Sequence, residues 1–217
     1  MAPSPAVGAE RARLLVATRS AHKLRELREL LDVHAELVDL DDVGIADEAV
    51  EDGETFESNA SKKARFYCSL SGLPTLADDS GIEVDALGGG PGVRTRRYAG
   101  EQATDPENNA KLLGALDGLP ADLRGARYRC ALALALPEDR GARGGLPLRF
   151  AHGTCEGRIA GAPKGDGGFG YDPIFEPASE RPGGRTLGEW SAAAKNRISH
   201  RGKAARRMRT ILLALGF

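Results

Sequence analysis

Aromatic residues and cysteine are scarce in this sequence, which has 5% aromatic side chains and three cysteines among 217 residues. Cys68, Cys130 and Cys155 are widely spaced, without CxxC pairs or neighbouring histidine ligands, which favours reduced structural thiols over a disulfide framework or a zinc site. An apolar run of membrane-spanning length is missing and the formal net charge is −1, so we expect neither a membrane nor a nucleic-acid partner. Residues 1–11 lack the apolar core of a signal sequence, so we expect a flexible tail and a cytoplasmic protein.

Charge is unevenly distributed along the chain. Residues 39–57 carry nine Asp or Glu and no basic residue, whereas residues 195–209 carry seven Lys or Arg and no acidic residue. Such runs are usually solvated surface, but they can also supply a metal-binding side and a phosphate- or base-binding side of one cleft. The length and the 41% hydrophobic content suffice for a substantial core, and we expect a single domain over residues 12–217.

Hydrophobic periodicity predicts alternating strands and helices, followed by a hairpin. Thr55 and Thr104 stand where helix N-caps are expected, and the polar segment 137–145 separates the two strands of the hairpin. The pattern predicts an α/β or α+β protein with a mixed sheet. The expected strands are residues 14–17, 126–136 and 148–159. The first expected helix begins near His22, and four more cover about 56–70, 104–116, 186–194 and 200–215.

Two adjacent carboxylates, Asp78 and Asp79, end a short apolar run and directly precede Ser80 and Gly81. Clustered negative charge is unfavourable unless a cation, basic side chains or solvent compensates it, so the pair is a candidate metal site. The alternative is a surface turn, because Asp, Ser and Gly together are common in turns.

The segment TRSAHK, residues 18–23, lies between the first expected strand and the first expected helix. Backbone N–H groups and the helix dipole favour anions at such a place, so Thr18, Ser20 and Lys23 can hold a polyphosphate. The alternative is a helix cap with a solvated lysine. The loop is not a Walker P-loop, because the G-x-x-x-x-G-K-[ST] pattern is missing.

Two further segments carry polar and aromatic groups suited to a planar base. Residues 165–170, GDGGFG, match G-x-G-x-x-G but are followed by Tyr171 and Asp172 instead of a helix, so a Rossmann site is excluded. This loop can bring backbone and the Phe169 ring to a base, or it can be a tight turn with two core aromatics. The segment SHR, residues 199–201, can donate hydrogen bonds to a base or a phosphate, or it can be a helix start with Ser199 as N-cap and exposed cations.

The order of these segments is more specific than any one of them. A Thr/Ser/Lys loop, an acidic segment, ADDSG, GGFGYDP and KNRISHRG follow one another from about Leu14 to the C-terminus. This set resembles the inosine triphosphate pyrophosphatase family, also called the Ham1 or RdgB type. The resemblance implies an elongated mixed sheet flanked by helices, with two lobes around a central substrate cleft. It also implies a homodimer that hydrolyses ITP, dITP and XTP to the monophosphate and pyrophosphate with Mg²⁺ as cofactor.

By the same resemblance, Asp79 is expected to be the general base and a metal ligand, with Glu51 and Asp78 near the same metal. Lys23 is expected to neutralise charge during phosphoryl transfer. The substrate-binding residues that the resemblance implies are Thr18, Arg19, Ser20, Ala21, His22, Lys23, Ser80, Phe169, Gly170, Tyr171, Asp172, Lys195, His200 and Arg201.

The sequence departs from the family pattern at two places. Arg19 and Ser20 stand where the usual loop T-G-N-x-x-K has Gly and Asn, and Arg94 and Arg96 stand where a tyrosine and a small residue are common. The first departure leaves open an alternative from another class, a non-catalytic protein that binds or senses purine nucleotides.

Overall fold

The computed structural model describes residues 11–137 and 147–217. The expected tail, apart from Arg11, and most of the segment 137–145 lie outside the described residues. Among the described helices, none has the length and apolar character needed to cross a membrane.

The described chain forms a six-stranded sheet, and the sheet is mixed, as the sequence predicts. Its strand order is β2-β1-β3-β4-β5-β6, in which β1 runs parallel to β2 and β3 and the remaining neighbours are antiparallel. The predicted hairpin is confirmed, because β4 and β5 pair along their whole length. The strands are β1 (Arg13–Ala17), β2 (Glu36–Val38), β3 (Thr75–Val84), β4 (Gly125–Ala135), β5 (Leu148–Ile159) and β6 (Phe175–Pro177).

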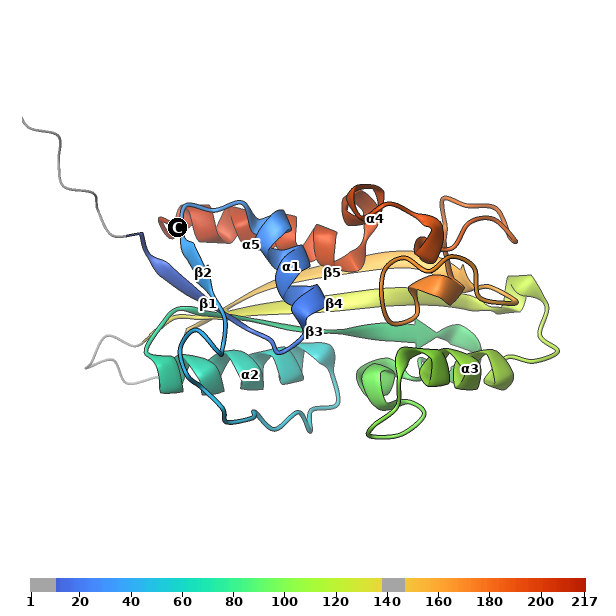
Figure 1. Cartoon of the computed structure of the whole chain (residues 1–217), viewed down its shortest axis with the longest axis horizontal. Helices are drawn as coiled ribbons and strands as arrows, with labels where there is room; N and C mark the ends of the chain where they lie inside the picture. Colours follow the sequence, from blue (N-terminus) through green and yellow to red (C-terminus); the bar gives the residue numbers. More distant parts are fainter. Residues whose placement is uncertain (1–10, 138–146) are drawn as a thin grey trace, which may run out of the picture.

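Helices cover both faces of this sheet. In Figure 1, α1, α4 and α5 lie above the sheet, and α2 and α3 lie below it. The α/β fold with a helix-flanked mixed sheet is therefore confirmed, whereas the single domain over residues 12–217 stays a prediction. The helices are α1 (Ala21–Leu31), α2 (Phe56–Ser71), α3 (Asp105–Ala115), α4 (Ala192–Ile198) and α5 (His200–Ala214).

Side-chain caps start these helices where the sequence predicts. Thr55 caps α2, Thr104 forms a capping box with Glu107 at α3, and Ser199 caps α5. The helix expected over residues 186–194 is wrong in position: Leu187–Glu189 form one 3₁₀ turn, and α4 begins only at Ala192. The cause is a second capping box, in which Glu189 bonds back to Thr186 and closes the short turn before Ser191 caps α4.

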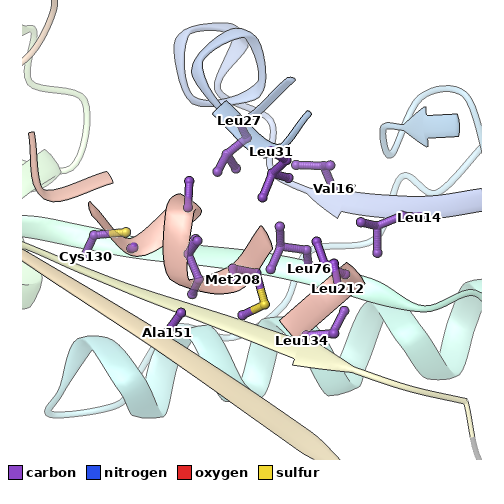
Figure 2. Packing of buried hydrophobic residues seen from close by; sticks show 13 residues of the cluster. Leu14, Val16, Leu27, Leu31, Leu76, Cys130, Leu134, Ala151, Met208 and Leu212 are labelled. Atoms are coloured by element: carbon purple, nitrogen blue, oxygen red, sulfur yellow. The ribbon is translucent and has the colours of Figure 1, made fainter. Parts of the chain in front are cut away.

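The core above the sheet joins α1 and α5 to the strands. Figure 2 shows Leu27 and Leu31 of α1 and Met208 of α5 packed over strand residues such as Leu76. Burying a leucine side chain fully contributes about 1.5–3 kcal/mol, so this cluster fixes both helices to the sheet. Helix α5 comes especially close at Gly153 of β5, where a Cβ would overlap the carbonyl oxygen of His200. That contact places the first turn of α5 against the middle of the sheet.

The Asp78–Asp79 pair lies in the interior of β3, which corrects the surface-turn alternative. Asp79 pairs with Ala131 of β4, and the strand continues to Val84. Because neighbouring strand residues point to opposite faces, Asp78 faces α1 and α5 while Asp79 faces α2. On its other edge β3 pairs with β1 only as far as Ala77, where β1 ends. This edge is therefore open at Asp78, and the cleft lies there. Farther along β3 the edge is covered again, because Thr95 Oγ1 accepts from the N–H of Ile82 and Glu83 forms a β-bridge with Pro91.

Candidate active site

A cavity of about 490 Å³ lies beside the open edge of β3, at the carboxyl end of β1. This is where open α/β sheets place their ligands. The structure brings all of the predicted site residues to this one cavity, from five separate segments of the chain. They are Thr18, Arg19, Ser20, Ala21, His22, Lys23, Glu51, Asp78, Asp79, Ser80, Phe169, Gly170, Tyr171, Asp172, Lys195, His200 and Arg201.

Asp78 is surrounded by hydrogen-bond donors on the α1 and α5 face. Its Oδ1 accepts from Lys23 Nζ at 2.7 Å and from Ser80 Oγ at 2.8 Å, and its Oδ2 accepts from Arg201 Nε at 2.9 Å and from Cys130 Sγ at 3.2 Å. Burial alone would raise the pKa of this carboxyl, but Arg201 and Lys23 outweigh it and hold the pKa well below its usual value. Asp78 is thus a fixed anion whose two oxygens are both engaged.

Asp79 lies in a different environment on the α2 face. Lys63 Nζ lies 3.3 Å from Asp79 Oδ1 and 2.8 Å from Glu51 Oε2, so this lysine bridges the two carboxylates. Asp79 Oδ2 is buried and has no hydrogen-bond partner among the described residues. Burial raises the pKa of Asp79 above its usual value, opposed by Lys63 and Lys23. A buried carboxylate oxygen without a protein partner is available to a cation or to water.

Glu26 of α1 bridges two cationic side chains at the cavity, those of Lys195 and Arg201. Its carboxylate accepts from Lys195 Nζ at 3.0 Å and from Arg201 Nη1 at 2.6 Å. Burial would raise the pKa of Glu26, but Arg201 and Lys195 outweigh it and lower the pKa. Lys195 Nζ also donates to Asp172 Oδ2 at 2.7 Å. The cations that precede and start α5 are therefore buried and paired, which corrects the alternative of exposed cations at SHR.

Aromatic and imidazole rings also line the cavity. The Phe169 ring stacks on His22 with centroids 5.1 Å apart, and Lys195 Nζ lies 4.6 Å from its centroid. His200 stacks on Tyr128 at 4.6 Å, and its buried Nδ1 has no hydrogen-bond partner within the described segments. Burial, reinforced by Arg201, lowers the pKa of His200 well below its usual value, so the ring is neutral near pH 7.

The glycine-rich loop that carries Phe169 is shaped by its glycines. Gly165, Gly168 and Gly170 have φ of 72°, 74° and 63°, the left-handed region that favours glycine. Asp172 Oδ2 closes the turn by accepting from the backbone N–H of Phe169 at 2.9 Å. Tyr171 points into the core, where its hydroxyl donates to the carbonyl of Thr95 at 2.8 Å. The tight-turn and base-binding alternatives are therefore compatible, because the turn itself presents Phe169 to the cavity.

The segment from Thr18 to Lys23 forms the start of α1 as well as part of the cavity wall. Ser20 is the N-cap and accepts from the Lys23 N–H at 3.4 Å, as the helix-cap alternative predicts. The solvated lysine of that alternative is wrong, because Lys23 Nζ is paired with Asp78 at 2.7 Å. The first turn of α1 has no acidic residue, so the N-terminal end of the helix dipole faces the cavity uncompensated. The guanidinium of Arg19 leaves this loop and contacts the backbone around Ala46.

The residues at the site that the sequence did not predict include Lys63, Glu26 and Tyr128. Lys63 had a recognisable signal, because it lies seven residues after Phe56 and therefore on the apolar face of the predicted helix, where a lysine needs a buried partner. Glu26 lies one turn after Lys23 on the same helix face. Tyr128 gave no signal, since its place in the predicted strand is equally suited to the core.

The chain was compared with known proteins. A model of the Ham1 family matches residues 14–211. The dITP/XTP pyrophosphatase of Syntrophobacter fumaroxidans is 48% identical over 196 residues, which are 90% of this chain and 79% of that protein. The corresponding figures for the dITP/XTP pyrophosphatase of Geobacter sulfurreducens are 49% over 193 residues, 88% of this chain and 92% of that protein. A solved structure of a HAM1 protein from Coxiella burnetii superposes with a TM-score of 0.81 at 39% identity, covering 94% of this chain and 99% of that one. A family match over nearly the whole chain, supported by sequence and fold, shows that this protein belongs to the Ham1 family.

Proposed function

We propose that this protein is a nucleoside triphosphate pyrophosphatase that hydrolyses ITP, dITP and XTP to the monophosphate and pyrophosphate. Relatives that are 48% and 49% identical over most of the chain carry the name dITP/XTP pyrophosphatase. The observation that carries the proposal is Asp79, a buried carboxylate with a raised pKa and one unpartnered oxygen in the cavity. Such a group has the position and the basicity of a general base.

We propose Glu51 and Asp79 as the protein ligands of Mg²⁺, with substrate phosphates and water as the remaining ligands. Mg²⁺ is commonly bound in this way, through one or two carboxylates and the phosphates. The free Oδ2 of Asp79 supports the assignment. When bound, Mg²⁺ would neutralise charge on the phosphate oxygens. Asp78 has both oxygens engaged, so we give it the role of fixing Lys23 and Arg201.

In the proposed reaction, Asp79 accepts a proton from a water molecule that attacks the α-phosphorus. The bond from that phosphorus to the bridging oxygen breaks, and the electron pair leaves with pyrophosphate. Lys23, at the start of α1, and Lys63, beside Asp79, lie on opposite faces of β3 and would neutralise the charge that develops on the phosphates. The free N-terminal N–H groups of α1 would bind the phosphates from the same side as Lys23.

We propose that the purine base lies at the end of the cavity formed by Phe169, Lys195 and His200. The aromatic ring offers a stacking surface, and His200, whose buried Nδ1 has no partner among the described residues, would bind the 6-oxo group of hypoxanthine or xanthine. Lys195 and Arg201, which are already ion-paired, would place positive charge beside that oxygen and join it only by sharing their N–H groups. Adenine carries an amino donor at that position, so these donors would disfavour ATP and dATP.

The test is incubation of the purified protein with ITP, dITP, XTP, GTP and ATP, with and without Mg²⁺, while pyrophosphate and inorganic phosphate are assayed separately. We expect pyrophosphate from ITP, dITP and XTP only with Mg²⁺. Reaction in ¹⁸O-labelled water should place the label in the monophosphate, because attack is at the α-phosphorus. Binding of ITP without any turnover would select the non-catalytic alternative.

The homodimer and the cytoplasmic location that the sequence analysis expects stay predictions. Size-exclusion chromatography with light scattering tests the first, because a dimer would elute with twice the mass of the 22.9 kDa chain.

A further inference from the structure

Arg19 connects the start of α1 to the segment between β2 and α2, which we call the acidic loop, residues 39–54. The ion pair between Arg19 Nη1 and the Asp41 carboxylate measures 3.5 Å. The other nitrogen, Nη2, donates to the carbonyl oxygens of three consecutive residues: Ile45 at 2.9 Å, Ala46 at 2.9 Å and Asp47 at 3.2 Å.

The acidic loop needs external support because it lacks regular structure and carries charge of one sign. It contains eight Asp or Glu and no basic residue, so its side chains repel one another. On one side, α2 supports it: the Tyr67 hydroxyl accepts from the N–H of Ala49 at 3.2 Å, and Lys63 holds Glu51. Two further cations come from the segment that leads into α1 and from α1 itself. Arg28 pairs with the side chains of Asp39 and Asp42, whereas Arg19 bonds to the loop backbone.

From this geometry we infer that Arg19 is a positioning residue that holds the acidic loop against the start of α1, so that Glu51 stays at the cavity beside Asp79. This differs from the substrate-binding role expected from the sequence. To contact a phosphate, the guanidinium would have to give up its bonds to three carbonyl oxygens and one carboxylate. The catalytic part of this inference rests on the function proposed above, whereas the structural part does not.

Hydrogen exchange of the protein without nucleotide or Mg²⁺ tests the structural part. The backbone amides of Gly44, Ile45 and Ala49 are hydrogen-bonded within or to the loop and report on its opening. In Arg19→Ala these amides should exchange about 5- to 30-fold faster than in the wild type, the range that one or two kcal/mol produces. Arg25→Ala is the matched control, because Arg25 is an exposed arginine on α1. In this variant the amides of the acidic loop should exchange at the wild-type rate.

Arg19→Gln is a second variant should Arg19→Ala fail to fold, because it removes the charge and shortens the side chain but keeps N–H donors. Cleavage after Glu48 and Glu51 by a glutamate-specific protease gives an independent measure of loop opening. Faster cleavage in both Arg19 variants is expected. Loop exchange and cleavage at wild-type rates in either folded variant would overturn the inference.

Steady-state hydrolysis of ITP separates positioning from phosphate binding. A displaced Glu51 should lower kcat about tenfold or more and leave KM within about threefold, because misplacement acts on the chemical step. A raised KM with unchanged kcat and unchanged loop exchange would show that Arg19 binds phosphate and would overturn the inference. If the wild type hydrolyses no triphosphate, the proposed function fails, and the exchange experiment still decides whether Arg19 holds the loop.

Discussion

Replacing Asp78 by asparagine is expected to destabilise the protein strongly, whereas the same replacement at the neighbouring Asp79 is not. The side chain of Asp78 is 0% exposed and that of Arg201 is 2% exposed, so their ion pair is fully buried. An asparagine keeps one oxygen acceptor, but its NH₂ group would face either the Arg201 or the Lys23 donors. Among the described residues, the variant therefore leaves Arg201 with Glu26 as its one anionic partner and leaves Lys23 without a carboxylate.

The size of the effect follows from this burial. Removing one charge of a buried ion pair costs about 3–5 kcal/mol. For a chain of this length that corresponds to a fall in Tm of about 6–20 °C. The pKa of Asp78 lies well below its usual value, so its stabilising contribution is fully present above the usual Asp pKa and is lost as the pH falls through the lowered value. The difference between wild type and Asp78→Asn should therefore shrink in acid.

Asp79→Asn is the matched comparison. Burial raises the pKa of Asp79 above its usual value, so its ionised form costs stability at neutral pH, and a neutral asparagine removes that cost. Lys63 keeps its bond to Glu51 in this variant. We expect an unfolding free energy equal to or above that of the wild type, together with loss of ITP hydrolysis.

Urea and thermal unfolding at pH 7, with pyrophosphate release measured in parallel, compare the two variants. An Asp78→Asn protein within about 1 kcal/mol of the wild type would refute the assignment of a costly buried ion pair, since the expected loss is at least about 3 kcal/mol. An Asp79→Asn protein that loses as much stability as Asp78→Asn would show that Asp79 supports the fold. Wild-type turnover in Asp79→Asn would remove this residue from the reaction.

Three more perturbations test the rest of the cavity. Lys63→Met removes a cation that lowers the pKa of Asp79, so burial should raise this pKa further. Because turnover needs ionised Asp79, the acidic limb of the kcat/KM profile should move to higher pH. Phe169→Ala should raise KM for ITP about tenfold with a smaller change in kcat, because a base stacks on the ring before and during reaction; an unchanged KM would contradict the proposed base position. Glu26→Gln leaves Arg201 with one anionic partner, and chemical unfolding should show a loss smaller than that of Asp78→Asn, because Glu26 is partly open to solvent.

Local patterns were sufficient for the elements with strong periodicity or caps. The strand at Leu14, the helix after Thr55 and the β4–β5 hairpin lie where the sequence predicts, because alternation and N-cap chemistry depend on near neighbours alone. Strands β2, β3 and β6 were missed. Three residues are too few to show a period of two in β2 and β6, and the two carboxylates that follow the apolar run conceal the continuation of β3 to Val84. The helix expected over residues 186–194 was misplaced because Glu189 turns back to cap Thr186.

The sequence by itself predicted a set of side chains that the structure does bring to one cavity, because the ordered motifs carry the expected phosphate loop, the carboxylate pair and the expected base-binding segments together. Only the tertiary structure decided what each of them faces. The side-chain alternation of β3 sends Asp78 to Lys23 and Arg201 and sends Asp79 to Lys63, and so gives two identical neighbours pKa shifts in opposite directions. The tertiary structure also decided where β1 ends, and this leaves the edge of β3 open at Asp78. Strand register and burial depend on residues far apart in the chain, and these long-range contacts turn a run of two carboxylates into one fixed anion and one carboxylate with an unpartnered oxygen.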